Sequence, residues 1–321
     1  MLNLVGPMLL SIPLLLTQDK PPEKILTLPR PAADYGPAIQ ISPDNRTLAC
    51  PSKEGLVLWE LPGGKQIGTI PVRAEGGFAF NPDGKSIVTE NTPEGEVQVW
   101  SVNPLKFTRK ATIPSRLISM TFTKDGSRMA LQTLFGIFII SSNNLQVINK
   151  IDIESKTLKI HPDGKTLILI PTSETSDQVI YVDLKAGKPS LSPIRRGDLF
   201  EGVAISDDGA FLATASDPKK PKSHDLDLKI WDGKRGKEGR LLATGAFYAK
   251  ELRFSANGQI LGTIARGDSG PGSLRLWDQK LGVALWPEVT KRMLGDKFAF
   301  SPDGKMIGLV SSNEVTVWTL P

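Results

Sequence analysis

One short phrase recurs seven times along the 321-residue chain, and this repetition limits the fold more than any other feature. Each copy places Pro-Asp-Gly, or a close equivalent, between two short apolar runs, as in FNPDGKSIV and FSPDGKMIG. The glycine, or the asparagine that replaces it, returns after 38 to 49 residues. This period is typical of the four-stranded blades of propellers, at about 40–45 residues each. The copies begin at Ile41, Phe80, Phe122, Ile160, Ile205, Phe254 and Phe300.

The recurring phrase predicts a β-hairpin. Asp-Gly or Asn-Gly between apolar runs supplies the positive φ that a tight turn needs, and the Asp side chain caps the turn. A third strand follows, in which apolar residues alternate with others and an aromatic residue usually stands near the end. These third strands are 56–61, 97–102, 137–142, 179–184, 228–233, 274–279 and 315–320. A weaker fourth strand comes next, so each repeat predicts one antiparallel four-stranded blade.

The two ends of the repeat series predict how the ring closes. The sequence ends at Pro321, one residue after the third strand of the seventh repeat, so that blade lacks a fourth strand. The segment ILTL, Ile25–Leu28, precedes the first repeat and can supply it, which would also cover an open sheet edge. We therefore expect an all-β fold, a seven-bladed β-propeller of four-stranded antiparallel blades, closed by the N-terminal strand joining the last blade. Residues 20–321 would form this single domain, as a monomeric ring.

The N-terminal residues 1–19 form a different kind of segment. The apolar run Leu9–Leu16 is followed by the polar stretch QDKPPEK. Such a run is too short to span a bilayer comfortably and is typical of a signal peptide, although no Lys or Arg precedes it and no A-x-A site follows. An uncleaved membrane anchor and a buried N-terminal segment are the alternatives. We expect a secreted or periplasmic protein with no membrane span in the mature chain.

The repeats resemble those of the WD-repeat family of seven-bladed propellers. The resemblance rests on the spacing, on the Pro-Asp-Gly turns, and on the third-strand pairs Trp231-Asp232 and Trp277-Asp278, and it covers Ile25 to Leu320. It implies the propeller fold and a role as an interaction platform, with very diverse partners. The Gly-His pair that opens a WD repeat is missing from all seven copies, so the family's network of Asp, His, Ser/Thr and Trp cannot be assembled. We therefore transfer the architecture and no contact position.

Composition narrows the classes of function. Lys plus Arg is 39 and Asp plus Glu is 34, a net charge of +5 spread along the chain, which is too mild and too scattered for a nucleic-acid partner. The single cysteine, Cys50, excludes an intrachain disulfide and a cysteine-built zinc site. His161 and His224 are the only histidines, which leaves little for a histidine metal cluster. We expect no cofactor and no catalysis.

Four local motifs have a structural interpretation beside a chemical one. Gly267–Gly272 (GDSGPG) resembles the nucleophile segment of trypsin-like serine proteases, but without an obvious histidine partner it is better explained as a glycine-rich loop. His161 takes the place that serine occupies in other repeats, which indicates a turn residue. His224 lies among acids in a polar loop and could in principle bind a metal. Asn45-Arg46-Thr47 fits a glycosylation sequon and also fits a turn with Asn in place of Gly.

Loop length indicates where a partner would bind. In a propeller, the turns between second and third strands and the connections between blades open on one side of the ring, which we call the loop face. Blades four to six carry long inserts there, whereas the turns on the opposite side are short. Long loops on a rigid ring are common recognition sites, although drift of unconstrained loops would also produce them. The candidate basic and aromatic surface comprises Arg195, Arg196, Phe200, Lys219, Lys220, Lys222, Arg266, Trp286, Lys291 and Arg292.

These observations favour a non-catalytic platform that binds a protein or peptide, in which the rigid ring holds the loops in place and lowers the ordering cost of binding. The main alternative is a propeller enzyme with an axial metal or cofactor, lactonase-like or quinoprotein-like. Its acidic ligands would come from separate blades, because no calcium-loop motif is present. A third possibility is a purely structural part of a larger surface assembly.

Overall fold

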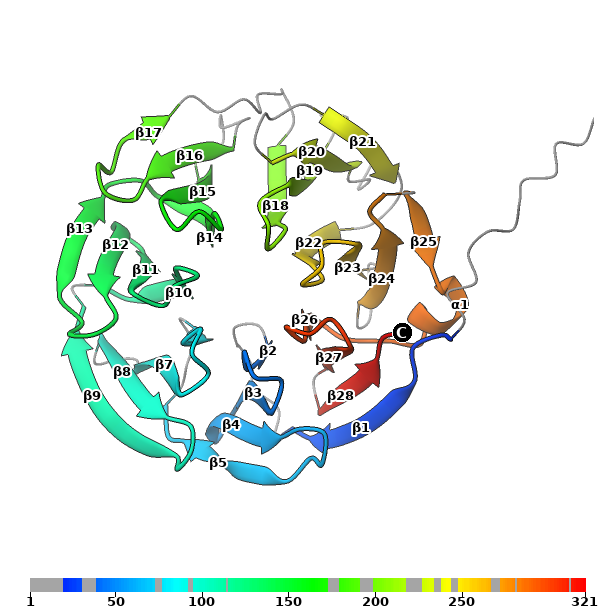
Figure 1. Ribbon diagram of the computed structural model, residues 1–321, viewed down its shortest axis with the longest axis horizontal. Helices are drawn as coiled ribbons and strands as arrows, with labels where there is room; N and C mark the ends of the chain where they lie inside the picture. Colours follow the sequence, from blue (N-terminus) through cyan, green and yellow to red (C-terminus); the bar gives the residue numbers. More distant parts are fainter. Residues whose placement is uncertain are drawn as a thin grey trace, which may run out of the picture.

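The computed structural model describes residues 20–30, 39–72, 77–91, 95–113, 115–172, 179–190, 199–217, 227–233, 238–243, 248–266, 272–280, 282–311 and 313–321. Within them, the strands form seven four-stranded antiparallel sheets arranged in a ring (Figure 1). The predicted all-β, seven-bladed β-propeller is confirmed. In every blade the first strand lies nearest the ring axis and the later strands lie progressively further out.

Blades 1 to 4 follow one another along the chain, each with its strands in sequence order. Blade 1 consists of β2 (Gln40–Ile41), β3 (Thr47–Ser52), β4 (Gly55–Glu60) and β5 (Gln66–Ile70). Blade 2 consists of β6 (Phe78–Phe80), β7 (Ser86–Asn91), β8 (Glu96–Ser101) and β9 (Lys106–Thr112). Blade 3 consists of β10 (Leu117–Phe122), β11 (Arg128–Thr133), β12 (Gly136–Ser141) and β13 (Val147–Ile151). Blade 4 consists of β14 (Ser155–Ile160), β15 (Thr166–Pro171), β16 (Ile180–Asp183) and β17 (Pro189–Ser190).

Blades 5 and 6 repeat this order, and a short helix precedes blade 7. Blade 5 consists of β18 (Leu199–Ile205), β19 (Phe211–Asp217), β20 (Asp227–Asp232) and β21 (Glu238–Ala243). Blade 6 consists of β22 (Tyr248–Phe254), β23 (Ile260–Arg266), β24 (Ser273–Asp278) and β25 (Val283–Leu285), and is followed by α1 (Pro287–Thr290). Blade 7 consists of β26 (Lys297–Phe300), β27 (Met306–Val310), β28 (Glu314–Thr319) and, from the other end of the chain, β1 (Lys24–Pro29).

The ring closes through the N-terminal strand, as the sequence predicts. β1 is antiparallel to β28, with Leu28 opposite Val315, and forms the outer strand of blade 7. Beyond β1, the Arg30 side chain donates from Nε to the carbonyl oxygen of Pro51 at 2.8 Å and from Nη1 to that of Ser311 at 2.9 Å. One side chain therefore also links blade 7 to blade 1.

The apolar core lies mainly between neighbouring blades. Where blade 7 meets blade 1, Leu28, Val315 and Val317 belong to the same buried cluster as Cys50 and Trp59. Burial raises the pKa of the Cys50 thiol to about 12, so this cysteine is a packing residue. Because burying a side chain of this size contributes about 1.5–3 kcal/mol, each blade is stabilised chiefly by its neighbours.

The recurring phrase forms the turn between the first and second strands of each blade. In blade 5, the Ser206 hydroxyl donates to Asp208 Oδ1 at 2.6 Å, and Asp208 Oδ1 accepts the Ala210 amide at 2.9 Å. The amide of Gly209 bonds back to the Ser206 carbonyl, and the Ser206 amide donates to the Phe211 carbonyl. The positive φ therefore stands at the fourth turn position, in a turn whose paired ends enclose four residues. Positive φ values of 62 to 73° occur at Asn45, Gly84, Gly126, Gly164, Gly209, Gly258 and Gly304.

Candidate functional site

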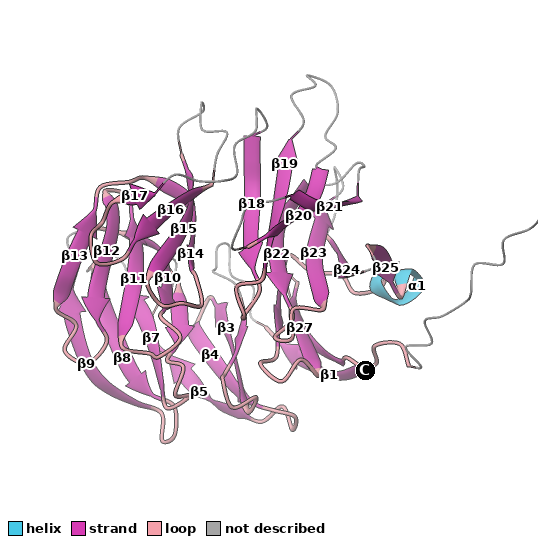
Figure 2. Cartoon of the chain, turned by 45° about the horizontal axis from the view of Figure 1, so that its top comes forward, coloured by secondary structure: helices cyan, strands magenta, loops and turns pink. Residues whose placement is uncertain are grey.

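The two faces of the ring differ in how completely their loops are described. The seven hairpin turns between first and second strands lie on one face, which we call the turn face, and all seven lie within the described residues. The loop face carries the second-to-third strand turns and the blade-to-blade connections. Several of its segments in blades 4 to 6 lie outside the described residues (Figure 2).

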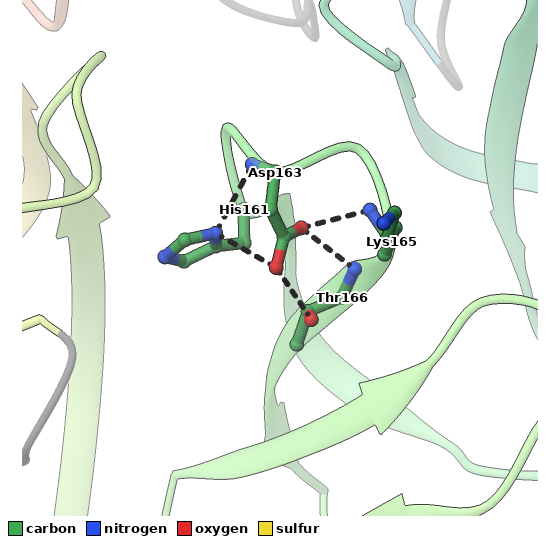
Figure 3. Close-up of polar contacts among 4 residues, drawn as sticks. All are labelled: His161, Asp163, Lys165 and Thr166. Atoms are coloured by element: carbon green, nitrogen blue, oxygen red, sulfur yellow. Dashed lines mark hydrogen bonds and ion pairs between the residues drawn. The ribbon is translucent and has the colours of Figure 1, made fainter.

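On the turn face, His161 is a turn residue of blade 4, as its place in the repeat predicts (Figure 3). Its Nδ1 accepts a hydrogen bond from the Asp163 amide at 3.1 Å and lies 3.2 Å from Asp163 Oδ2. A serine hydroxyl, such as that of Ser206 in blade 5, takes the equivalent place in other blades. Burial alone would raise the pKa of Asp163, but hydrogen bonds from Lys165 and Thr166 and the nearby His161 lower it overall. These contacts account for His161 without catalysis.

Neighbouring turns also contact each other around the turn face. Asn45 Oδ1, from blade 1, accepts the amide of Asp303 in blade 7 at 3.1 Å. A Cβ built on Gly209 of blade 5 would lie 2.8 Å from His161 Nε2 of blade 4. The Asn45 side chain therefore bonds to the turn of the neighbouring blade, which favours the interpretation of Asn45 as a turn residue over a glycosylation site.

The candidate basic and aromatic surface is only partly visible. Lys291 and Arg292 are exposed, in the connection between blades 6 and 7. Phe200 lies in β18 and Arg266 ends β23, but their side chains are outside the described set. The remaining basic residues, Arg195, Arg196, Lys219, Lys220 and Lys222, lie outside the described residues, as do His224 and 267–271 of the protease-like motif. This surface therefore stays a prediction.

Trp286 lies in the same connection and packs inward. It is half-buried against the apolar cluster that includes Leu285 and Met293, and it precedes α1 with a left-handed backbone (φ 44°). The segment after α1 bonds to β24, since the Leu274 amide donates to the Met293 carbonyl at 2.9 Å. The connection between blades 6 and 7 is thus attached to blade 6.

An exposed apolar tip marks the loop face of blade 3, and the sequence interpretation missed it. Leu134 and Phe135 form the turn between β11 and β12 and are 53% and 67% exposed. Ile118 is 44% exposed beside Leu117, which lies opposite Thr133, so it reaches the same end of the blade. We call Ile118, Leu134 and Phe135 the blade-3 tip. Two large apolar residues in a tight turn, where polar residues are usual, were a signal available in the sequence.

A second feature missed from the sequence is a charged cluster on the inner strands. Arg253 Nε donates to Glu251 Oε1 at 2.9 Å within β22, and Lys297 Nζ of β26 donates to Glu251 Oε2 at 3.1 Å. Burial would raise the pKa of Glu251, but Arg253, Lys297 and Lys159 of β14 lower it to about 2. The pattern Glu-Leu-Arg, which places two charges on one face of an inner strand, was its sequence signal.

Buried polar side chains on the second strands of blades 2 and 3 also join blades 2, 3 and 4. Glu90 is fully buried, and its Oε1 accepts the Leu117 amide of blade 3 at 2.9 Å. Gln132 stands at the corresponding position of blade 3, where its amide donates to the Ser155 carbonyl of blade 4. The repeat therefore uses one position for two blade-to-blade hydrogen bonds.

Two third-strand tryptophans donate hydrogen bonds to threonines of the neighbouring second strand. Trp231 Nε1 donates to Thr214 Oγ1 at 2.8 Å in blade 5, and Trp277 Nε1 donates to Thr263 Oγ1 at 3.1 Å in blade 6. Both bonds link the third strand to the second. Satisfying a largely buried indole N–H in this way fixes the ring of each Trp in the core.

The described residues contain no group of three or more His, Cys, Asp or Glu side chains placed to hold a metal ion. They also contain no helix of the length and apolarity that crossing a bilayer requires.

The ring defines the protein as a seven-bladed β-propeller, and solved propellers are similar to it. One is Kuenenia stuttgartiensis hydrazine synthase, with a TM-score of 0.71, 19% identity, and coverage of 90% of this chain and 97% of that chain. Another is the β-propeller domain of Myceliophteria thermophila Cps50 (Swd1), with a TM-score of 0.71, 10% identity, and coverage of 94% and 100%. At these identities the likeness concerns the fold alone. Comparisons with protein-family models and with curated proteins each gave no match.

Proposed function

We propose that this chain is a WD-repeat-like, exported propeller whose loop face binds a protein or peptide and performs no chemistry. The observation that carries this proposal is the blade-3 tip. Its three apolar side chains, Ile118, Leu134 and Phe135, are 44%, 53% and 67% exposed at one end of one blade. Exposing apolar surface on a rigid hairpin is a common feature of protein-binding sites.

The rigidity of the tip supports a role in recognition. Behind it, Thr133 Oγ1 donates to the Gly136 carbonyl at 3.0 Å and accepts the Phe135 amide at 3.2 Å. β11 and β12 pair without a register shift up to this turn. A partner that packs on the tip would therefore pay little ordering cost, because the turn is already fixed.

The charged cluster weighs against the alternative of an axial metal at its level of the ring. Lys159, Arg253 and Lys297 surround Glu251, whose two oxygens already bond to Arg253 and Lys297. A divalent cation here would face three positive charges and one occupied carboxylate. This arrangement favours an anion over a metal ion.

The experiment is affinity capture from the native envelope fraction with three immobilised proteins. These are the wild type, the double variant Leu134→Ser/Phe135→Ser, and the control Val147→Ser/Ile148→Ser, whose residues are 55% and 51% exposed on the outer strand β13 of the same blade. The tip variant should lose a defined partner by about tenfold or more, whereas the control should retain it. Identical capture by all three proteins would rule out the tip as the binding site.

A second arm tests the basic part of the loop face. Changing Arg195, Arg196, Lys219 and Lys220 together to Glu should weaken capture of the same partner, and more strongly at low than at high salt. Unaltered capture at both salt concentrations would remove these residues from the proposed surface.

A further inference from the structure

A cavity of about 270 Å³ lies among the inner strands of blades 4 to 7, toward the turn face. Its charged groups are those of Lys159 in β14, Arg253 in β22 and Asp207 in the turn of blade 5. Ala204 of β18 lies between β14 and β22 in blade order. Because Ala204 is small, it leaves room that a longer side chain would fill. Phe254 and Phe300 add apolar surface to the lining.

The charges of this cavity are not balanced. Both oxygens of Glu251 are used by Arg253 and Lys297, so one carboxylate serves two cations. Lys159 is half-buried and forms no hydrogen bond or ion pair with any residue that the structure describes. Asp207 and Lys124 interact with each other on the turn face, so their charges offset one another. The excess of positive charge therefore remains with Lys159 and Arg253.

The lowered pKa of Lys159 is consistent with this excess of positive charge. Burial, together with the repulsion of Arg253, lowers its pKa to about 8. A buried cation of this kind costs stability unless a counterion is present. Arg253 has used its Nε on Glu251, and its two terminal nitrogens form no hydrogen bond with the described residues. The Lys159 ammonium group and the terminal nitrogens of Arg253 are thus hydrogen-bond donors in one cavity that have no acceptor among the described residues.

We propose that this cavity binds a small organic carboxylate. Lys159 and the terminal nitrogens of Arg253 would hold the carboxylate, and the apolar body would pack against Phe254 and Phe300. The volume of about 270 Å³ leaves room for a small carboxylic acid with an apolar body. The site lies toward the turn face, whereas the blade-3 tip lies on the loop face. The carboxylate-binding proposal therefore does not depend on the proposed partner binding.

The test is isothermal titration of the full chain with benzoate, with its neutral analogue benzamide, and with inorganic phosphate. Benzoate should bind at least about tenfold more tightly than benzamide, because the charged group supplies the main contact. It should also bind more tightly than phosphate, which has no apolar body. Equal binding of benzamide, tighter binding of phosphate, or no binding of benzoate would each overturn the assignment.

Two variants locate the site. Lys159→Met should weaken benzoate binding by at least about tenfold, whereas Lys165→Met, an exposed lysine in the adjoining turn of blade 4, should leave it unchanged. Removing the charge of Lys159, whose pKa burial lowers, is expected to stabilise the fold. A thermal melt of Lys159→Met that is no lower than that of the wild type then separates lost binding from unfolding. Unchanged binding by Lys159→Met would contradict the proposal.

Discussion

The backbone amide of Thr319 donates a hydrogen bond of 2.8 Å to the carbonyl oxygen of Glu23, although the two residues lie 296 positions apart. This bond extends the pairing of β1 with β28, in which Leu28 lies opposite Val315. The ends of the described ring are therefore joined by main-chain bonds as well as by the buried cluster around Leu28.

Replacing Leu28 with Asp should open the junction between blades 7 and 1. Leu28 is 3% exposed, so an unpaired carboxylate there should cost about 3 kcal/mol of unfolding free energy or more. Cys50 shares its cluster and is the only cysteine, so its reaction rate with a thiol reagent reports the opening. Ile25→Asp, on the same strand and 42% exposed, is the control and should leave the rate low. A protected Cys50 in Leu28→Asp would show that closure does not depend on this contact.

Gly209 should tolerate alanine much less well than Gly164 does. Both have positive φ, 71° and 65°, so both variants pay backbone strain of about 1 kcal/mol. A Cβ added at Gly209 would lie 2.8 Å from Nε2 of His161, whereas a Cβ added at Gly164 would meet no neighbouring residue within 4 Å. Urea denaturation should show Gly209→Ala to be the less stable by about 1 kcal/mol or more. Adding His161→Ala should recover that difference, and failure to recover it would place the strain elsewhere.

Glu251→Gln should destabilise the fold at neutral pH and much less in acid. The variant leaves Arg253 and Lys297 without their shared carboxylate, at a cost of about 3 kcal/mol. In the wild type the folded pKa of Glu251 is about 2 against an ordinary 4.5, so its contribution is complete above 4.5 and is lost as the pH falls toward 2. The gap in unfolding free energy between the two proteins should therefore narrow between pH 4.5 and 2. A gap independent of pH would contradict this assignment.

Lys159→Met should raise the unfolding free energy at neutral pH, whereas Glu251→Gln lowers it. The folded pKa of Lys159 is about 8 against an ordinary 10.5. The charged lysine therefore destabilises the folded state below pH 8, and between pH 8 and 10.5 the folded state has lost a proton that the unfolded chain still binds. Wild-type stability should consequently rise between pH 8 and 10.5. At pH 7 the variant should be the more stable by on the order of 2 kcal/mol, and the two proteins should converge near pH 10.5. A less stable variant at pH 7 would mean that Lys159 has a counterion.

The fold could be predicted because each repeat carries local and periodic information. Asp-Gly marks the turns, alternation marks the strands, and ILTL before the first repeat marks the closing strand, which the pairing of Leu28 with Val315 confirms. The place of His161 could be predicted in the same way, by comparison with Ser206 and the other serines. Repetition made both inferences possible without any knowledge of distant contacts.

The charged cluster could not be assembled from the sequence with equal ease. Lys159, Glu251 and Lys297 come from three different blades, 4, 6 and 7. No local spacing encodes such a meeting across the ring. The blade-3 tip is a different case, because Leu134-Phe135 is local and visible, but attention to long loops favoured blades 4 to 6.

The most direct measurement of the proposed function is photo-crosslinking in the native envelope fraction. A benzophenone amino acid would replace Phe135 at the tip in one protein and Val147 on β13 in the other, both of which are exposed in blade 3. Partner binding at the loop face predicts a discrete crosslinked species of defined mass from position 135 and none from position 147. The same products from both positions, or none from position 135 while a partner is still captured, would contradict a binding site at the blade-3 tip.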